Sequence, residues 1–130
     1  MDPHIKLLWL DTLRTAQPNT NGRLATCPVT AQAGIGPVQH SALGWLCELA
    51  MQAGMPLVKE KTTNPYLPGY LVLTYNGEAI ALPDVVARWA DLGPLPWLIT
   101  KRLGIQNLAY ISGHNDGTFA EVIALIETHF

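Results

Sequence analysis

The chain has few of the features that mark specialised classes of protein. Only two of its 130 residues are cysteines, Cys27 and Cys47. Two thiols are too few for the disulfide framework of a small secreted domain, so a reducing, cytoplasmic setting is predicted. Charged residues make up 14% of the chain, and eight Lys and Arg against ten Asp and Glu give a net charge of −2. Since the cations form no run, binding to duplex nucleic acid is not predicted.

Long apolar runs and leader-like segments are also missing. No apolar stretch approaches the ~18 residues of a membrane-spanning helix. Met1 leads directly into Asp2-Pro3, without the basic and apolar regions of a signal peptide. We therefore expect neither a membrane association nor a cleaved leader.

The histidines lack the spacing of a metal site. No pair has the i, i+4 or short-loop separation that zinc ligands use. His114 with Asp116 would supply two metal ligands, but the chain offers no clear third. The simpler interpretation of these residues is a polar loop ahead of a helix. Neither a metal nor another cofactor is predicted. The four histidines are His4, His40, His114 and His129.

What is present is the patterning of one domain spanning residues 1–130. Hydrophobic residues make up 48% of the chain, enough for a sizeable core at this length. The clearest single signal is at the end. Thr118 and Glu121 have the spacing of a capping box, and an apolar stripe follows it. The stripe comprises Phe119, Val122, Ile123, Ile126 and Phe130.

Four further helices are predicted from caps and apolar spacing. One begins at the N-cap Asp2 and runs to about Arg14. A second, broad and apolar, runs from about Gln39 to Ala53, with Gly54 after it. Pro83 opens a third, which ends at Gly93, and a short one covers Trp97–Leu103.

The predicted strands are mostly shorter than the helices. Tyr70–Tyr75, the turn Asn76-Gly77 and Glu78–Leu82 form the strongest hairpin signal, because Asn-Gly supplies the positive φ angles of a type I′ turn. Other strands are expected over 23–30, broken by Pro28, over 57–63 and over 108–111. The predicted fold class is α+β: four to five helices packed on a small antiparallel sheet containing the Tyr70–Leu82 hairpin.

Catalytic chemistry has little support in the residue patterns. Cys47 lies in the apolar stripe of the second helix, where a free cysteine behaves as a small hydrophobe. Cys27 is expected to be more accessible, and His40 is the base that a nucleophilic role would require. The acidic residues mostly occupy helix caps and polar helix faces, which helix electrostatics explains. The tryptophans Trp9, Trp45, Trp89 and Trp97 lie in helical stripes and are expected in the core unless some share an open pocket.

Anion binding is a further alternative. Gly34-Ile35-Gly36 lacks the third glycine and the lysine of phosphate loops, so a turn is the simpler interpretation. A loop arginine such as Arg23, beside Gly22, can donate a bidentate fork to a phosphate or carboxylate. The cations are equally explained as solvated surface charges. The candidate ligand-binding residues are Arg14, Asn21, Arg23, Lys101, Arg102, His114, Asn115 and Asp116; no catalytic residue is assigned.

Several short motifs, taken in order, carry a family resemblance. They are Trp9 with Leu13-Arg14, the Asn21–Leu24 stretch, Leu43–Leu49, Leu82-Pro83 with Arg88–Leu92, and Asn115–Glu121. Together they resemble a widespread family of small phage-encoded proteins, whose members read Trp-x3-Leu-Arg, Leu-Gly-x-Leu-Cys, Trp-Ala-x-Leu and Asn-Asp-x-Gly-x-Thr-Phe-x-Glu.

The chain departs from the family pattern at three places. Asn115-Asp116 aligns with the Asn-Asp loop of the family only with a shift. The paired cysteines that precede the central motif are Ser41 and Ala42 here, and the early Ser-Gly is Thr15-Ala16. Any metal or redox role of the paired cysteines is therefore absent. The family has no assigned activity, so the resemblance implies a phage origin more firmly than a mechanism.

The resemblance implies an accessory protein acting in the cytoplasm of an infected host cell. We expect a non-enzymatic binder that neutralises a host defence component, either as a sponge for a nucleotide second messenger or as an inhibitor of a host defence protein. A homo-oligomer is compatible with both. The alternative is a small nucleotide-processing hydrolase with Asp116, His114 or Cys27 in its site.

Overall fold

The protein is described by a computed structural model, in which residues 1–16, 23–92 and 120–130 are placed. These residues form a mixed α+β fold with four helices and a five-stranded antiparallel sheet. The predicted fold class is confirmed at this level. The expected helix over 97–103, the expected strand over 108–111 and Thr118 of the capping box lie outside the described residues.

The sheet is built around two central strands. β1 (Ala25–Thr30) pairs with β5 (Tyr70–Tyr75), and β4 (Lys59–Thr63) pairs with the other side of β5. Two short strands, β2 (Gly34–Ile35) and β3 (Gln39–His40), pair with the two ends of β1. β4 is therefore an outer strand of the sheet.

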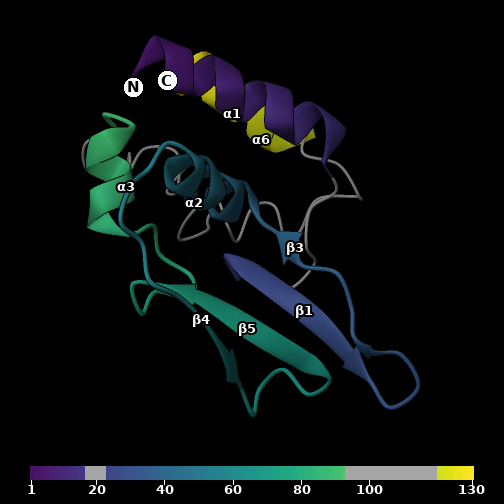
Figure 1. Ribbon diagram of the computed structural model, residues 1–130. Helices are drawn as coiled ribbons and strands as arrows, with labels where there is room; N and C mark the ends of the chain where they lie inside the picture. Colours follow the sequence, from purple (N-terminus) through teal and green to yellow (C-terminus); the bar gives the residue numbers. More distant parts are fainter. Residues whose placement is uncertain (17–22, 93–119) are drawn as a thin grey trace.

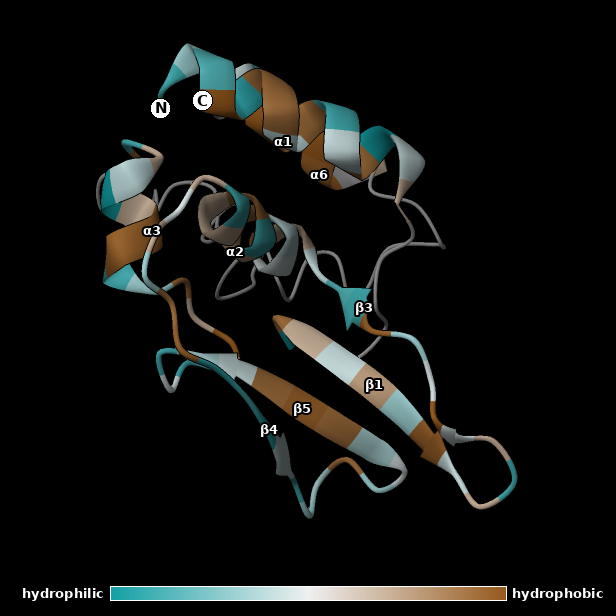
Figure 2. Cartoon of the chain, viewed as in Figure 1, coloured by the Kyte–Doolittle hydropathy of each residue, from teal (hydrophilic) through white to brown (hydrophobic). Residues whose placement is uncertain are grey.

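The helices lie on one side of this sheet in two tiers (Figure 1). α2 (Ala42–Gln52) lies next to the sheet, and α1 (Pro3–Thr15) and α6 (Ala120–His129) pack beyond it, while α3 (Asp84–Trp89) covers one end. Figure 2 shows the consequence for hydropathy: β5 is mostly hydrophobic, whereas β4 at the edge is hydrophilic to neutral.

α2 is the central helix, as its apolar breadth predicted. Leu43, Leu46, Cys47 and Ala50 are all fully buried, and Trp45 and Leu49 are partly buried against the same core. The indole Nε1 of Trp9 on α1 donates to the carbonyl oxygen of Ala42 at 2.8 Å, which joins the two tiers.

Gly44 lets α2 approach the sheet closely. A Cβ atom at this position would lie 1.9 Å from the carbonyl oxygen of Leu24. Ser41 accepts a hydrogen bond from Gly44 N through its hydroxyl oxygen and donates its own hydroxyl proton to Leu24 O. α2 is thereby capped and attached to the start of β1 by the same residue.

Several boundaries differ from the prediction. α3 ends at Trp89 rather than at Gly93, and β4 begins at Lys59 rather than at Leu57. α2 begins at Ala42 rather than near Gln39, because Ser41 is the N-cap and Gln39–His40 pairs with β1 as β3. β1 also continues through Pro28 rather than breaking there. The carbonyl of Pro28 accepts from Gly36 N on the β2 side. In a strand the N–H and C=O of one residue point to the same side, so the N–H that Pro28 lacks would also face Gly36 and not β5. The pairing of β1 with β5 does not need it.

The predicted hairpin is only partly formed. Asn76 and Gly77 adopt φ angles of 52° and 80°, and Tyr75 and Glu78 exchange two backbone hydrogen bonds. The prediction that Glu78–Leu82 forms a second strand is wrong. Both sides of β5 are already paired, so the chain turns away, and the carbonyl of Ala79 accepts from Leu24 N instead.

The terminal helices meet each other at the top of the fold. Asp2 caps α1 by accepting from the backbone N–H groups of His4 and Ile5, as predicted. From the stripe on α6, Val122 and Ile126 are fully buried, and Phe130 lies 6.4 Å from the Trp9 ring. In the described residues, no helix has the length and apolarity required to cross a membrane.

Candidate functional site

Most of the predicted ligand-binding residues lie outside the described part of the chain. This applies to Asn21, Lys101, Arg102, His114, Asn115 and Asp116. Arg14 is exposed at the end of α1, where its guanidinium pairs with Asp11 at 2.8 Å and with Glu127 of α6 at 3.4 Å. Arg23 is half-buried ahead of β1 and already has an interaction partner. The structure does not bring these two arginines into a described pocket.

The expected accessibility of Cys27 is wrong. The side chain is fully buried in β1, because the strand continues through Pro28 and places Cys27 opposite Leu71. Cys47 is fully buried as predicted, and burial, helped by the charge of Glu48, raises the pKa of its thiol to about 12. Neither thiol has the exposure that a nucleophile needs.

Beneath α2, a polar network gathers around Glu48. Its Oε1 atom accepts from Nε2 of His40 at 3.0 Å, from the Tyr75 hydroxyl at 3.0 Å, and from the Lys59 ammonium. The four side chains come from α2, β3, β5 and β4. The network therefore fastens the central helix to three strands.

The network holds Glu48 in its charged form. Burial alone would raise the pKa of this carboxyl, but the hydrogen bonds from His40, Lys59 and Tyr75 and the charge of Lys59 outweigh it and lower the pKa to about 2. Burial and the negative charge of Glu48 both raise the pKa of Tyr75. A carboxylate with three donors and little exposure is committed to structure rather than to proton transfer.

His40 and Trp45 form the inner boundary of this network. Their ring centroids lie 4.3 Å apart, and the rings are tilted by 37°. Nδ1 of His40 and Nε1 of Trp45 are buried, and neither has a hydrogen-bond partner in the part of the chain that the structure describes. The Trp45 ring thus packs against His40.

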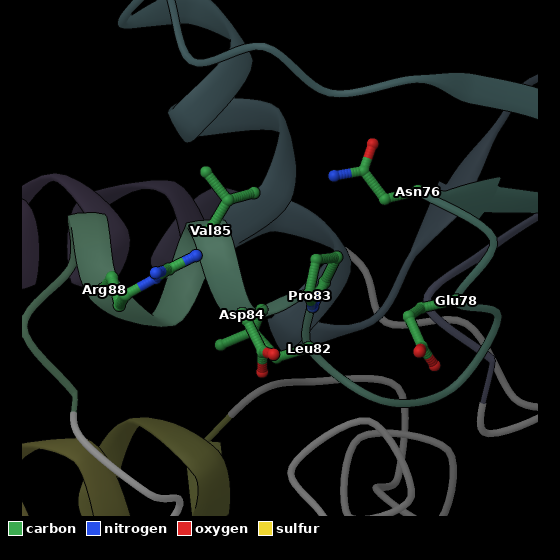
Figure 3. Close-up of a pocket in the computed structure, with 7 residues that line it drawn as sticks. All are labelled: Asn76, Glu78, Leu82, Pro83, Asp84, Val85 and Arg88. Atoms are coloured by element: carbon green, nitrogen blue, oxygen red, sulfur yellow. The ribbon is translucent and has the colours of Figure 1, made fainter.

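A pocket opens on the surface between the turn after β5 and helix α3 (Figure 3). It has a volume of about 310 Å³. Buried Leu82 and Pro83 and half-buried Val85 supply its apolar lining. Its polar lining carries two carboxylates and one guanidinium, all exposed: Glu78, Asp84 and Arg88, with the amide of Asn76 beside them.

The local fold explains how the pocket forms. Asn76 is fixed by accepting from Val58 N at 2.7 Å through its side chain and by donating its backbone N–H to Val58 O at 2.8 Å. Pro83 then starts α3 at once, so Asp84 and Arg88 lie one turn apart along the same short helix. The pocket is therefore shaped by a fixed turn on one side and a helix on the other.

The prediction from sequence missed both features. The general expectation that acidic residues occupy helix caps and polar helix faces includes Glu48. This residue is, however, the one charged residue of α2, an otherwise largely apolar helix, and that is a usable signal of a buried partner. The pocket had no such signal, since its residues were interpreted as a hairpin strand and a helix start. Among the described residues, no group of three or more metal-binding side chains is present.

Comparisons of the chain with protein-family models, with curated proteins and with solved structures found no match.

Proposed function

We propose that the protein is a small phage-encoded binder that neutralises a host defence component by occupying part of a host protein's surface. The phage setting and the anti-defence role rest on the family resemblance. The mode of action rests on one observation, the pocket between the turn after β5 and α3, which is lined by apolar side chains and by charged side chains of both signs. Such a surface is suited to the mixed side chains of another protein.

The charges of the pocket favour a protein over a nucleotide. Within the part of the chain that the structure describes, Glu78 and Asp84 contribute two negative charges to the lining and Arg88 one positive charge. A nucleotide messenger would bring phosphates toward two carboxylates, which repel them. Among the described residues that line the pocket there is no tryptophan or tyrosine on which a base could stack.

Exposed apolar residues adjoin the pocket and extend the surface available to a partner. Val58, which is hydrogen-bonded to Asn76, is 59% exposed. Ile80, between the lining residues Glu78 and Leu82, is 41% exposed. Apolar residues around a polar pocket are the arrangement expected where a second protein excludes water on binding.

The test uses bacteria that each carry one defence system and are challenged with a phage that this system restricts. Expression of the chain is expected to restore plaque formation against one system. The double variant Glu78→Gln/Asp84→Asn is expected to lose the effect. Glu60→Gln, an exposed acid on β4 outside the pocket, is the matched control and retains it.

Purified components then decide the mode of action. We expect the chain to co-elute with a protein of that defence system in size-exclusion chromatography. Co-elution with a nucleotide, together with a higher melting temperature in its presence, would establish the sponge instead. Turnover of a nucleotide would establish the hydrolase. Failure to restore plaques against any system would overturn the anti-defence role.

A further inference from the structure

We infer that the pocket beside α3 binds a basic side chain of the partner protein, arginine in preference to lysine. This inference rests on the proposed function and names the chemistry by which the partner is recognised. It is carried by the charges, the lining and the surroundings of the pocket.

The two carboxylates come from different elements and face one cavity. Glu78 follows the Asn76-Gly77 turn, and Asp84 lies in the first turn of α3. Neither forms an ion pair with any residue in 1–16, 23–92 or 120–130. A guanidinium carries five donors in a planar fork, so it can meet carboxylates that approach from two sides. A lysine ammonium meets them as a point charge.

The apolar part of the pocket suits the stem of such a side chain. Leu82, Pro83 and Val85 contribute apolar lining next to the charged groups. Long basic side chains pack their methylene groups on apolar surface while their charged ends seek polar partners. The volume of about 310 Å³ is large enough for one long side chain and lies at the low end of the range for small-molecule sites.

Arg88 adds a second requirement. It lines the same pocket one helical turn from Asp84, and it forms no ion pair within the described ranges. A purely cationic ligand would leave this guanidinium unpaired. A partner with an acidic residue next to its arginine would pair with Arg88 as well, so the pocket fits an Arg-Asp or Arg-Glu sequence.

The source is a protein rather than a free polyamine. Val58 and Ile80 leave exposed apolar surface adjoining the pocket, and a polyamine would not cover it. A polypeptide that inserts an arginine can place an apolar neighbour over these residues.

The experiment titrates the full chain with acetyl-Leu-Arg-Asp-amide and follows backbone amide shifts by NMR. We expect shifts at Glu78, Ala79 and Val85. A peptide with citrulline in place of arginine has the same shape without the charge, and it should cause no comparable shifts. The lysine peptide should bind more weakly than the arginine peptide but above the citrulline peptide.

Variants locate the binding. Glu78→Gln and Asp84→Asn should each weaken the arginine peptide by roughly two- to fivefold, as expected for exposed ion pairs. Arg88→Gln should weaken binding of the Leu-Arg-Asp peptide. The same substitution should have a smaller effect on a peptide in which asparagine replaces the aspartate. Glu60→Gln should bind as the wild type. Equal shifts with arginine and citrulline, or unchanged affinity in both acid variants, would overturn the inference.

The failure of this inference differs from the failure of the proposed function. If plaque restoration and co-elution persist in Glu78→Gln/Asp84→Asn, the proposed binding function stands, but recognition of a basic side chain by this pocket is wrong. If the wild-type chain neither restores plaques nor co-elutes with a defence protein, the proposed binding function is wrong, regardless of the result with the peptide.

Discussion

At the scale of single residues, Glu48 is the side chain with the most partners in the described core. Its carboxylate draws a histidine, a lysine and a tyrosine onto one oxygen atom. The donors are separated from it by 8, 11 and 27 positions in the chain. A group that connects such distant positions stabilises the fold only when the whole fold is formed, so its removal should act on global stability.

We expect Glu48→Gln to lower the free energy of unfolding by about 1–3 kcal/mol at pH 7, the cost of leaving buried donors poorly paired. Urea unfolding followed by circular dichroism measures it. Glu60→Gln, exposed on β4, should change the free energy by less than about 0.5 kcal/mol. Equal midpoints for wild type and Glu48→Gln would contradict the role assigned to the network.

The pH dependence of this contribution follows from the lowered pKa. The folded protein holds Glu48 with a pKa of about 2, against 4.5 as its ordinary value. The unfolded state therefore takes up the proton first. The stabilisation is complete above pH 4.5 and is lost as the pH falls toward 2. In Glu48→Gln this part of the acid sensitivity should disappear, and the difference between the two proteins should narrow below pH 4.5.

At the scale of elements, the packing of α2 on the sheet depends on a position without a side chain. Alanine in place of glycine inside a helix normally stabilises it by roughly 0.5–1 kcal/mol. At Gly44 the added methyl would meet the carbonyl oxygen of Leu24 at 1.9 Å. The backbone carbonyl of Leu24 cannot move aside as the end of a flexible side chain would. The clash should therefore outweigh the stabilisation that alanine normally gives a helix.

We expect Gly44→Ala to destabilise the protein by about 1–3 kcal/mol or more, the range for overpacked interiors. Thermal unfolding, with the midpoint read by circular dichroism, measures the loss. Gln52→Ala, at the exposed end of the same helix, should stay within about 0.5 kcal/mol of the wild type. A raised melting temperature in Gly44→Ala would show that α2 does not approach β1 as described.

The elements also show how far the sequence was predictive. α1, the core of α2, the start of α3 and the stripe on α6 follow from caps and helical spacing, which are local signals. The second arm of the hairpin failed because a local turn signal does not reveal that β4 and β1 occupy both sides of β5. The Glu48 network depends on contacts between distant segments, which local spacing does not encode. The pocket residues lie within 76–88, but they form a pocket because the chain turns away after Glu78, and that turn follows from the pairing of β5 with β1 and β4.

At the scale of the whole molecule, the two ends of the chain support each other. Ile126 and Val122 of α6 are fully buried in the same core as Trp9 of α1, and Arg14 pairs with Glu127 across the two helices. The exposed ion pair contributes little. The apolar contact should carry most of the coupling.

We therefore expect Ile126→Ala to cost about 2–5 kcal/mol, the range for deleting a buried isoleucine side chain. Hydrogen exchange should show lower protection across α1 as well as α6, because the two helices pack against each other. Thr128→Ala, at an exposed position of α6 where the hydroxyl bonds only to Ala124 O, should leave protection in α1 unchanged. Loss of protection confined to α6 would contradict the coupling.

The outer strand β4 has a consequence for the behaviour of many copies together. All five of its residues are exposed, and its central residue is Lys61. If two copies joined their sheets about a two-fold axis at that residue, two ammonium groups would stand directly opposite each other. Like charges at such a position repel. β4 is the edge to which a strand of another copy could add, and its central lysine therefore also disfavours edge-to-edge aggregation of the protein.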